Sequence, residues 1–372
     1  MPKGLTLILF AHLVCLSVLA NQPPDFVRSA KAVTANGQKI ENAKLFFAKD
    51  DTGFGASVVV GSKDQFEKFD GIIIQFSGVG GNIEQYGAMA QSTLNFCGVA
   101  SKLGLAPMAF ENPIYFGARD FDRSGRIAQA DRFSVLQNQI DWYTSTIERV
   151  IEHNPGKKIY PFGRSTGAST LAWWYLQGAR GDERIRRCLS KIPAILLGGI
   201  TGYQEDIMKV WTEVEDRDIG NDAVYDAIAT QADRKLYKQM RESEFAAAPT
   251  DFALPTVIAI GAGQDETMPL EAQQRVVARY SELAPSAPIV FLKSDAKHDP
   301  TKGYQLETPD RLIDVRQSQF FKDVLRTFVL NPELTHPAAG LHQMDLRFPL
   351  YPASIEDLKT CGAQLLNIPR GI

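Results

Sequence analysis

Six apolar runs of strand length alternate with longer stretches of helical period, and this alternation constrains the fold more than any other feature of the chain. The apolar runs are Gly71 to Phe76, Leu105 to Phe110, Lys158 to Phe162, Ile192 to Leu197, Thr256 to Ile260 and Ile289 to Leu292. The helical stretches are Ile83 to Leu103, Arg132 to Glu152, Thr166 to Gln177, Leu270 to Leu283 and Arg311 to Val329. The pattern predicts an α/β fold, with a mostly parallel sheet flanked by helices and ligand sites at the carboxyl ends of its strands.

The length and the N-terminal sequence indicate how the chain is organised. With 372 residues, 44% of them hydrophobic, the chain is long enough for one large domain with insertions. The basic start Met1 to Gly4 precedes an uncharged apolar run from Leu5 to Ala20, which is typical of a signal peptide and shorter than the ~20 residues that span a membrane. We therefore expect a signal peptide at 1–20, a main domain at 21–331 and a tail at 332–372 packed on that domain, with a membrane anchor as the alternative for the first segment.

The segment from Thr201 to Thr250 interrupts the alternation. It is polar, rich in charged and aromatic residues, and has no strand signal. It predicts a helical insertion between two strands, which would be either a lid over the strand ends or a surface elaboration.

Charge and cysteine content exclude several classes of partner. Without residues 1–20 the chain keeps 39 basic and 43 acidic side chains, a net charge of −4, which predicts binding neither to nucleic acid nor to an anionic membrane. Cys97, Cys188 and Cys361 remain, so at least one is a free thiol or bonds to another chain, and their spacing does not fix a pairing. No Cys/His spacing typical of a metal site occurs, and we expect no metal or organic cofactor.

The pentapeptide Gly163-Arg164-Ser165-Thr166-Gly167 lies between an apolar run and a helical stretch. A serine at such a sharp strand-to-helix turn is strained, and the flanking glycines let neighbouring chain pass close by. A glycine-rich surface turn is the alternative reading. We interpret Ser165 as a catalytic nucleophile because the residues that it would need also occur.

A serine nucleophile requires a base and an acid that orients the base. His298 follows the run that ends at Leu292, and Asp265 is the first carboxylate after the run that ends at Ile260. We expect His298 to be the base and Asp265 to be the acid, with Glu266 as the competitor for the acid. Acyl transfer also needs donors for an oxyanion.

The predicted oxyanion donors are two backbone amides. One is that of Thr166, directly after the nucleophile, and the other is that of Val79, with Gly80 as the next choice. Val79 lies in Ser77-Gly78-Val79-Gly80-Gly81-Asn82, which lacks the Lys-Ser/Thr ending of a phosphate-binding loop.

These features, in the order glycine-rich loop, Ser165, Asp265 and His298, resemble the α/β-hydrolase superfamily over residues 40 to 330. The stretch Glu111 to Arg119 is similar to an E-N-P-x-Y-G-x-R stretch in one poorly characterised branch of that superfamily. The chain departs from the common pattern at two places. Ser77 stands where a histidine usually begins the oxyanion loop, and Arg164-Ser165-Thr166-Gly167 stands at the strand-to-helix turn, where H-S-M-G is common. Both departures leave the backbone donors in place.

The resemblance implies an exported serine hydrolase that cleaves carboxylic esters through an acyl-enzyme, acting on a small-molecule or lipid-like ester. A peptidase or amidase on the same fold is one alternative, and a catalytically silent binding protein is another. Arg164 would either bind an acidic group of the substrate or pack beside the site, and Trp173 and Trp174 are expected in the core. The sequence specifies neither the acyl and alcohol groups nor the oligomeric state.

Overall fold

The computed structural model describes the larger part of the chain. The described residues are 26–31, 34–35, 38–39, 43–49, 54–78, 96–115, 123–200, 223–242, 251–263, 265, 268–294, 304–308, 311–315, 324–326 and 339–346. The proposed signal peptide and the residues after 346 lie outside them.

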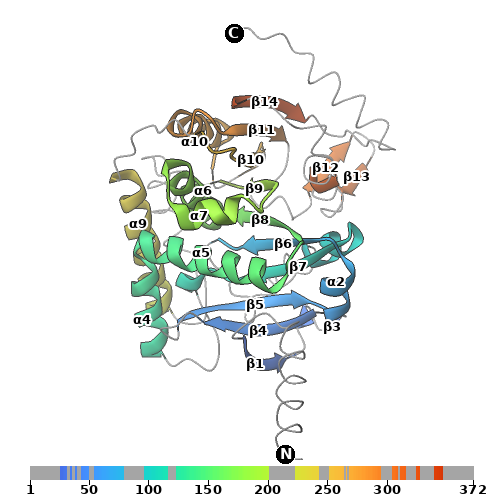
Figure 1. Cartoon of the computed structure of the whole chain (residues 1–372), viewed down its shortest axis with the longest axis vertical. Helices are drawn as coiled ribbons and strands as arrows, with labels where there is room; N and C mark the ends of the chain where they lie inside the picture. The colour runs from blue at the N-terminus through green and yellow to red at the C-terminus, as the bar shows by residue number, and fades with distance from the viewer. Residues whose placement is uncertain are drawn as a thin grey trace, which may run out of the picture.

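A ten-stranded sheet forms the centre of the molecule (Figure 1). Its strands, in spatial order, are β1 (Phe26–Lys31), β4 (Ala43–Lys49), β5 (Gly55–Gly61), β7 (Leu105–Phe110), β6 (Gly71–Phe76), β8 (Lys158–Arg164), β9 (Ala194–Gly198), β10 (Thr256–Ala262), β11 (Pro288–Ser294) and β14 (Gly340–Leu346). The strands from β7 to β14 pair in parallel, whereas the pairs β1–β4, β4–β5 and β5–β7 are antiparallel. Two short hairpins stand apart from this sheet, β2 (Thr34–Ala35) with β3 (Gln38–Lys39) and β12 (Tyr304–Thr308) with β13 (Arg311–Val315).

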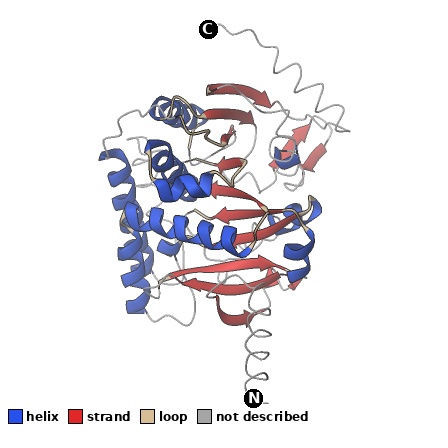
Figure 2. Cartoon of the chain, viewed as in Figure 1, coloured by secondary structure: helices blue, strands red, loops and turns tan. Residues whose placement is uncertain are grey.

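Apart from α2, which lies between β5 and β6, the helices come between parallel strands along the chain. Figure 2 distinguishes the helices from the strands of the sheet by colour. They are α2 (Lys63–Lys68), the 3-10 turn η1 (Pro113–Tyr115), α4 (Arg123–Phe133), α5 (Leu136–His153), α6 (Thr166–Arg180), α7 (Glu183–Leu189), α9 (Ala223–Glu242) and α10 (Leu270–Leu283). Residues 96–102 are also helical.

Apolar side chains pack on both faces of the sheet. On β6, Ile72 and Ile74 join a core shared with α5, α6 and α10, whereas Ile73 between them joins a second core shared with the helical residues 96–100. Successive side chains of a strand point to opposite faces, so a strand that is apolar at every position must be covered on both sides. This explains why the strands appear in the sequence as continuous apolar runs.

The structure confirms the predicted α/β-hydrolase fold. The strands Gly71–Phe76 and Leu105–Phe110 have the predicted bounds, and the other four predicted strands shift by at most two residues at either end. The serine-bearing strand β8 lies inside the parallel part, with β6 and β9 as neighbours. Helix α9 lies within the predicted insertion, whose remaining residues are outside the described ones.

One predicted helix is wrong. Residues 311–315 form strand β13, which pairs antiparallel with β12, and of the remainder of the predicted Arg311 to Val329 helix only 324–326 are described as helical. The intervening Pro309-Asp310 is a turn signal that favours a hairpin, and it outweighs the helical spacing of the apolar residues that follow. Strand β14, in the Pro-interrupted tail, was not predicted; it extends the sheet by pairing with β11.

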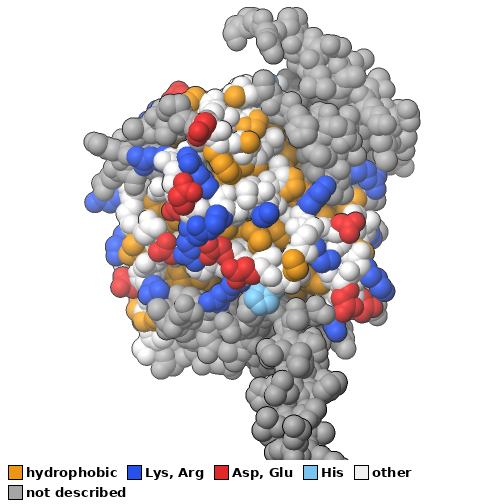
Figure 3. All heavy atoms as spheres, viewed as in Figure 1, with side chains coloured by type: hydrophobic (Ala, Val, Ile, Leu, Met, Phe, Trp, Pro, Cys, Tyr) orange, Lys and Arg blue, Asp and Glu red, His pale blue; other side chains and the backbone are white. Residues whose placement is uncertain are grey.

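Basic and acidic side chains are interspersed on the face in Figure 3. Arg184 pairs with Glu148, and Arg186 with Glu183. Within the described residues, no helix is long and apolar enough to cross a membrane. Cys97 and Cys188 are free, and burial raises the pKa of each thiol to about 12, so neither is a reactive thiolate at neutral pH.

Candidate active site

Ser165 occupies the sharp turn between β8 and α6. Its φ of 54° and ψ of −125° are a strained conformation, and it is the one non-glycine residue with positive φ among those described. Its backbone N–H donates to the Gly198 carbonyl of β9 at 2.9 Å, and its own carbonyl accepts from Ala168 at 2.8 Å. Thirteen of the fifteen residues of α6 are buried, so the helix behind the serine has almost no solvent face and holds the turn rigidly.

Two glycines make room for this turn. A Cβ on Gly167 would overlap the Phe76 carbonyl oxygen and lie 2.7 Å from that of Ser77. A Cβ on Gly78 would overlap the Cβ of Ser165 and lie 3.0 Å from its Oγ. The start of the glycine-rich loop after β6 therefore touches the serine, which is the geometry that an oxyanion loop needs. Val79 and Gly80, the predicted donors of that loop, lie outside the described residues.

Asp265 follows β10 and is held by two neutral donors. Its Oδ1 accepts from the Met268 N–H at 2.9 Å, and its Oδ2 accepts from Gln273 Nε2 at 3.1 Å. Gln273 is fully buried on α10 and also binds both backbone polar groups of Ala262. The carboxylate is thus fixed at the carboxyl end of β10. Its competitor Glu266 is outside the described residues.

The register of the parallel strands brings these segments to one edge of the sheet. Ser165 is bonded to Gly198, Gly198 pairs with Ile260 of β10, and the Gly263 N–H donates to the Ser294 carbonyl at the end of β11 at 2.6 Å. The chain that carries the predicted base therefore leaves β11 directly beside the loop of Asp265. His298 itself lies outside the described residues, and its role remains a prediction.

Thr166 has a partner that sequence reasoning missed. Asn112 Nδ2 donates to the Thr166 hydroxyl oxygen at 3.0 Å, and Asn112 Oδ1 accepts from the Ile114 N–H at 3.0 Å. Both side chains are buried. The E-N-P-x-Y resemblance was the one sequence signal for this contact; Gly117 and Arg119 of that stretch are not among the described residues.

The same turn also contacts the insertion helix. The Tyr115 hydroxyl, at the end of η1, donates to Asp233 Oδ2 on α9 at 3.3 Å. Asp233 is fully buried, and desolvation raises its pKa to about 8 although the Tyr115 bond opposes the shift. Asp233 is therefore a neutral carboxylic acid below that pH.

Three other predicted residues are buried. Arg164 is 4% exposed, which favours packing beside the site over binding a substrate group. Trp173 and Trp174 lie in the core, as predicted, and Trp174 Nε1 donates to Thr144 Oγ1 at 2.9 Å.

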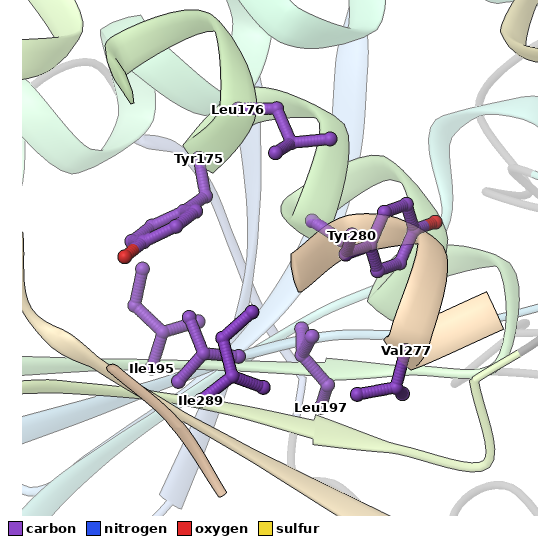
Figure 4. A pocket seen from close by; sticks show the side chains of 9 residues that line it. Tyr175, Leu176, Ile195, Leu197, Val277, Tyr280 and Ile289 are labelled. Carbon is purple, nitrogen blue, oxygen red and sulfur yellow. The ribbon is translucent and has the colours of Figure 1, made fainter. Parts of the chain in front are cut away.

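A small apolar gap lies farther along α6, between that helix, α10 and the sheet (Figure 4). Its lining includes Ala172, Tyr175, Leu197, Val277 and Ile289. Ala172 is seven residues beyond Ser165, so about 10 Å of helix separates the two. The gap has no polar lining surface and belongs to the packing of the core rather than to the site.

Solved structures that are similar to this chain include hydrolases and esterases at low sequence identity. No family model and no curated protein matches it. Among solved structures, it is similar to a presumed hydrolase from Agrobacterium vitis S4 (14% identity, 81% of this chain and 100% of that chain, TM-score 0.47). It is also similar to the esterase Pf2001 of Pyrococcus furiosus (13%, 69% and 84%, 0.42) and to the carboxylesterase CesB of Bacillus subtilis (11%, 70% and 86%, 0.41). The evidence for the α/β-hydrolase fold lies in the strand order of this chain and in the strained turn at Ser165.

Proposed function

We propose that this chain is an exported serine hydrolase that cleaves carboxylic esters through an acyl-enzyme. The observation that carries the proposal is Ser165, strained at the carboxyl end of β8 with Gly78 against its side chain. Strain of this kind costs on the order of 1–3 kcal/mol and is maintained where function requires it. A silent binding protein has no need of it. Export is inferred from the run Leu5 to Ala20.

In the proposed reaction, Ser165 Oγ attacks the carbonyl carbon of the ester while His298 takes the hydroxyl proton. The carbonyl oxygen becomes an oxyanion and accepts from the N–H groups of Thr166 and Val79. The bond to the alcohol oxygen breaks, and the alcohol takes the proton from His298. Water, deprotonated by His298, then attacks the acyl-serine. The bond between the acyl carbon and Ser165 Oγ breaks, Oγ takes the proton back from His298, and the carboxylic acid leaves. Asp265 holds the imidazole in the tautomer that accepts the serine proton.

Ser165→Ala is expected to abolish p-nitrophenyl ester turnover and labelling by a fluorophosphonate, while the melting temperature stays within a few degrees of the wild type. Removal of a triad nucleophile costs about 10⁶-fold in kcat. Full activity in this variant would end the proposal, and preferential turnover of peptide or amide substrates by the wild type would redirect it to the peptidase alternative.

The acid can be assigned with a matched pair. Asp265→Asn is expected to lower kcat by about 10⁴-fold, because the neutral amide no longer fixes the imidazole tautomer. Glu266→Gln removes the neighbouring carboxylate and serves as the control. The reverse result would exchange their roles.

A further inference from the structure

The turn formed by residues 111–115 connects the turn between β8 and α6, which carries Ser165, to helix α9 of the insertion. At one end, Asn112 Nδ2 donates to Thr166 Oγ1 at 3.0 Å. At the other end, the Tyr115 hydroxyl donates to Asp233 Oδ2. The orientation of the Asn112 amide is settled by its second contact, because the Ile114 N–H can only donate and must face Oδ1. Nδ2 is therefore the group that faces Thr166.

We propose that Asn112 is a positioning residue for the oxyanion site, holding the Thr166 hydroxyl and so aiming the Thr166 backbone N–H. This inference rests on the proposed function, in which that N–H binds the oxyanion. Asn112 touches neither the substrate nor the reacting atoms in this scheme. It acts through Thr166.

The place of Thr166 in the fold gives such a support a role. Thr166 is the first residue of α6, where backbone N–H groups have no partner within the helix. Its N–H is thus available to a ligand, but its direction depends on a turn that already contains the strained Ser165. A buried hydrogen bond to the Thr166 side chain limits rotation of this residue. Asn112 can provide it because it is itself held by the η1 turn: its Oδ1 accepts from the Ile114 N–H, and its backbone carbonyl accepts from the Tyr115 N–H at 2.9 Å.

The expected signature is a loss in kcat. Asn112→Ala is expected to lower kcat for p-nitrophenyl acetate about 10- to 100-fold, with KM changed less than about threefold. A misdirected donor weakens binding of the transition state more than binding of the substrate, and displacements of about 1 Å can cost 10²-fold. A purely structural role would instead lower the melting temperature and leave kcat of the folded protein unchanged.

The route through Thr166 is tested by a double-mutant cycle with Thr166→Val, which removes the hydroxyl and keeps the backbone N–H. Asn112→Ala is expected to have no further effect on kcat in the Thr166→Val background, and to have its full effect in the Thr166→Ser background, where a hydroxyl remains. Thr170→Val is the matched control. Thr170 lies one turn farther along α6, is buried, and donates from its hydroxyl to Gln139. In that background the Asn112→Ala loss should be as large as in the wild type.

Equal losses from Asn112→Ala in the wild-type and Thr166→Val backgrounds would overturn the inference, as would a change confined to KM. These outcomes leave the proposed function standing, because fluorophosphonate labelling of Ser165 in the wild type reports on that separately. A wild type without labelling or turnover would overturn both. If Asn112→Ala does not fold, Thr166→Val measured against Thr166→Ser must show the same kcat loss, or the inference fails.

Discussion

The first turn of helix α6 and the part of the helix beyond it are packed in different ways. At its N-terminal end, backbone runs against backbone and there is no room for a Cβ on Gly167, while the buried hydroxyl of Thr166 is bonded to Asn112. Farther along, Ala172 and Leu176 face an apolar gap between the helix and the sheet (Figure 4). The contrast indicates where precise packing is required in this fold: at the turn that presents the serine, and much less where the helix borders the gap.

Glycine substitutions at the two ends should break this comparison most sharply. Gly167→Ala is expected to destabilise the protein by about 3 kcal/mol or more, because the new Cβ meets carbonyl oxygens of Phe76 and Ser77 that cannot move without shifting β6. For Gly178→Ala, on the same helix, the atoms nearest to the new Cβ belong to the side chains of Leu189 and Ile185.

Small movements of the Leu189 and Ile185 side chains can relieve the overlap at position 178. Alanine also has about 1 kcal/mol more helix propensity than glycine. The net cost of Gly178→Ala should therefore be about 1 kcal/mol or less. Urea unfolding of both variants measures the difference. Equal losses of unfolding free energy in the two variants would show that the helix is packed no more rigidly at Gly167 than at Gly178.

Asp233, which bonds to Tyr115 beside the serine turn, should make the stability of the protein depend on pH. The folded state raises the pKa of this carboxyl from 3.8 to about 8, so between these values the folded protein keeps a proton that the unfolded chain has lost. Stability from this group is complete below about pH 4 and is lost as the pH rises towards 8, by an amount on the order of a few kcal/mol. Asp233→Asn removes this titration and keeps an acceptor for Tyr115.

The melting temperature of Asp233→Asn, relative to the wild type, is accordingly expected to rise between pH 5 and pH 9. Thermal unfolding at several pH values in buffers of equal ionic strength measures this. A difference between the two proteins that is the same at every pH would show that Asp233 does not titrate in this range.

The apolar gap between α6, α10 and the sheet should tolerate added side-chain volume. Val277→Ile adds one methylene towards the gap and is expected to stabilise the protein by about 0.5 kcal/mol, somewhat less than the ~0.8 kcal/mol of a fully buried methylene. Val276→Ile is the matched control, since Val276 is buried on the same helix but does not line the gap. There the extra methylene should cost about 1 kcal/mol. Denaturant midpoints that fail to separate the two variants would mean that the gap is already filled in solution.

The sequence predicted those parts of the fold whose signal is local. The strand Gly71–Phe76 is buried at every position and apolar except at Gln75, because both faces are covered, and the serine turn needs glycines at fixed spacing, so both were visible in one stretch of chain. Helix α4 was missed because its sequence, with Ser124 and Gly125 in the first turn, has a weak amphipathic pattern. Residues 311–315 were predicted to be helical, but they form strand β13 because they pair with β12. That pairing cannot be seen within the segment itself.

The site could be predicted only as far as its residues carry motifs. Ser165 and Asp265 follow strand ends, and the order of motifs made them candidates for the nucleophile and the acid. The contact of Asn112 with Thr166 joins residues 54 positions apart, and that of Tyr115 with Asp233 joins residues 118 apart. Pairing at such distances depends on how the helices pack on the sheet. In the sequence, Asp233 is one charge in a polar helix and resembles a solvent-exposed residue.

The central claim is that Ser165, His298 and Asp265 meet at one edge of the sheet. A crystal structure of the protein after reaction with a fluorophosphonate tests this most directly. We predict phosphorus bonded to Ser165 Oγ, the imidazole of His298 within about 3.2 Å of that oxygen, and the other ring nitrogen donating to Asp265. An adduct at Ser165 with a different imidazole beside it, or with none, would contradict the account.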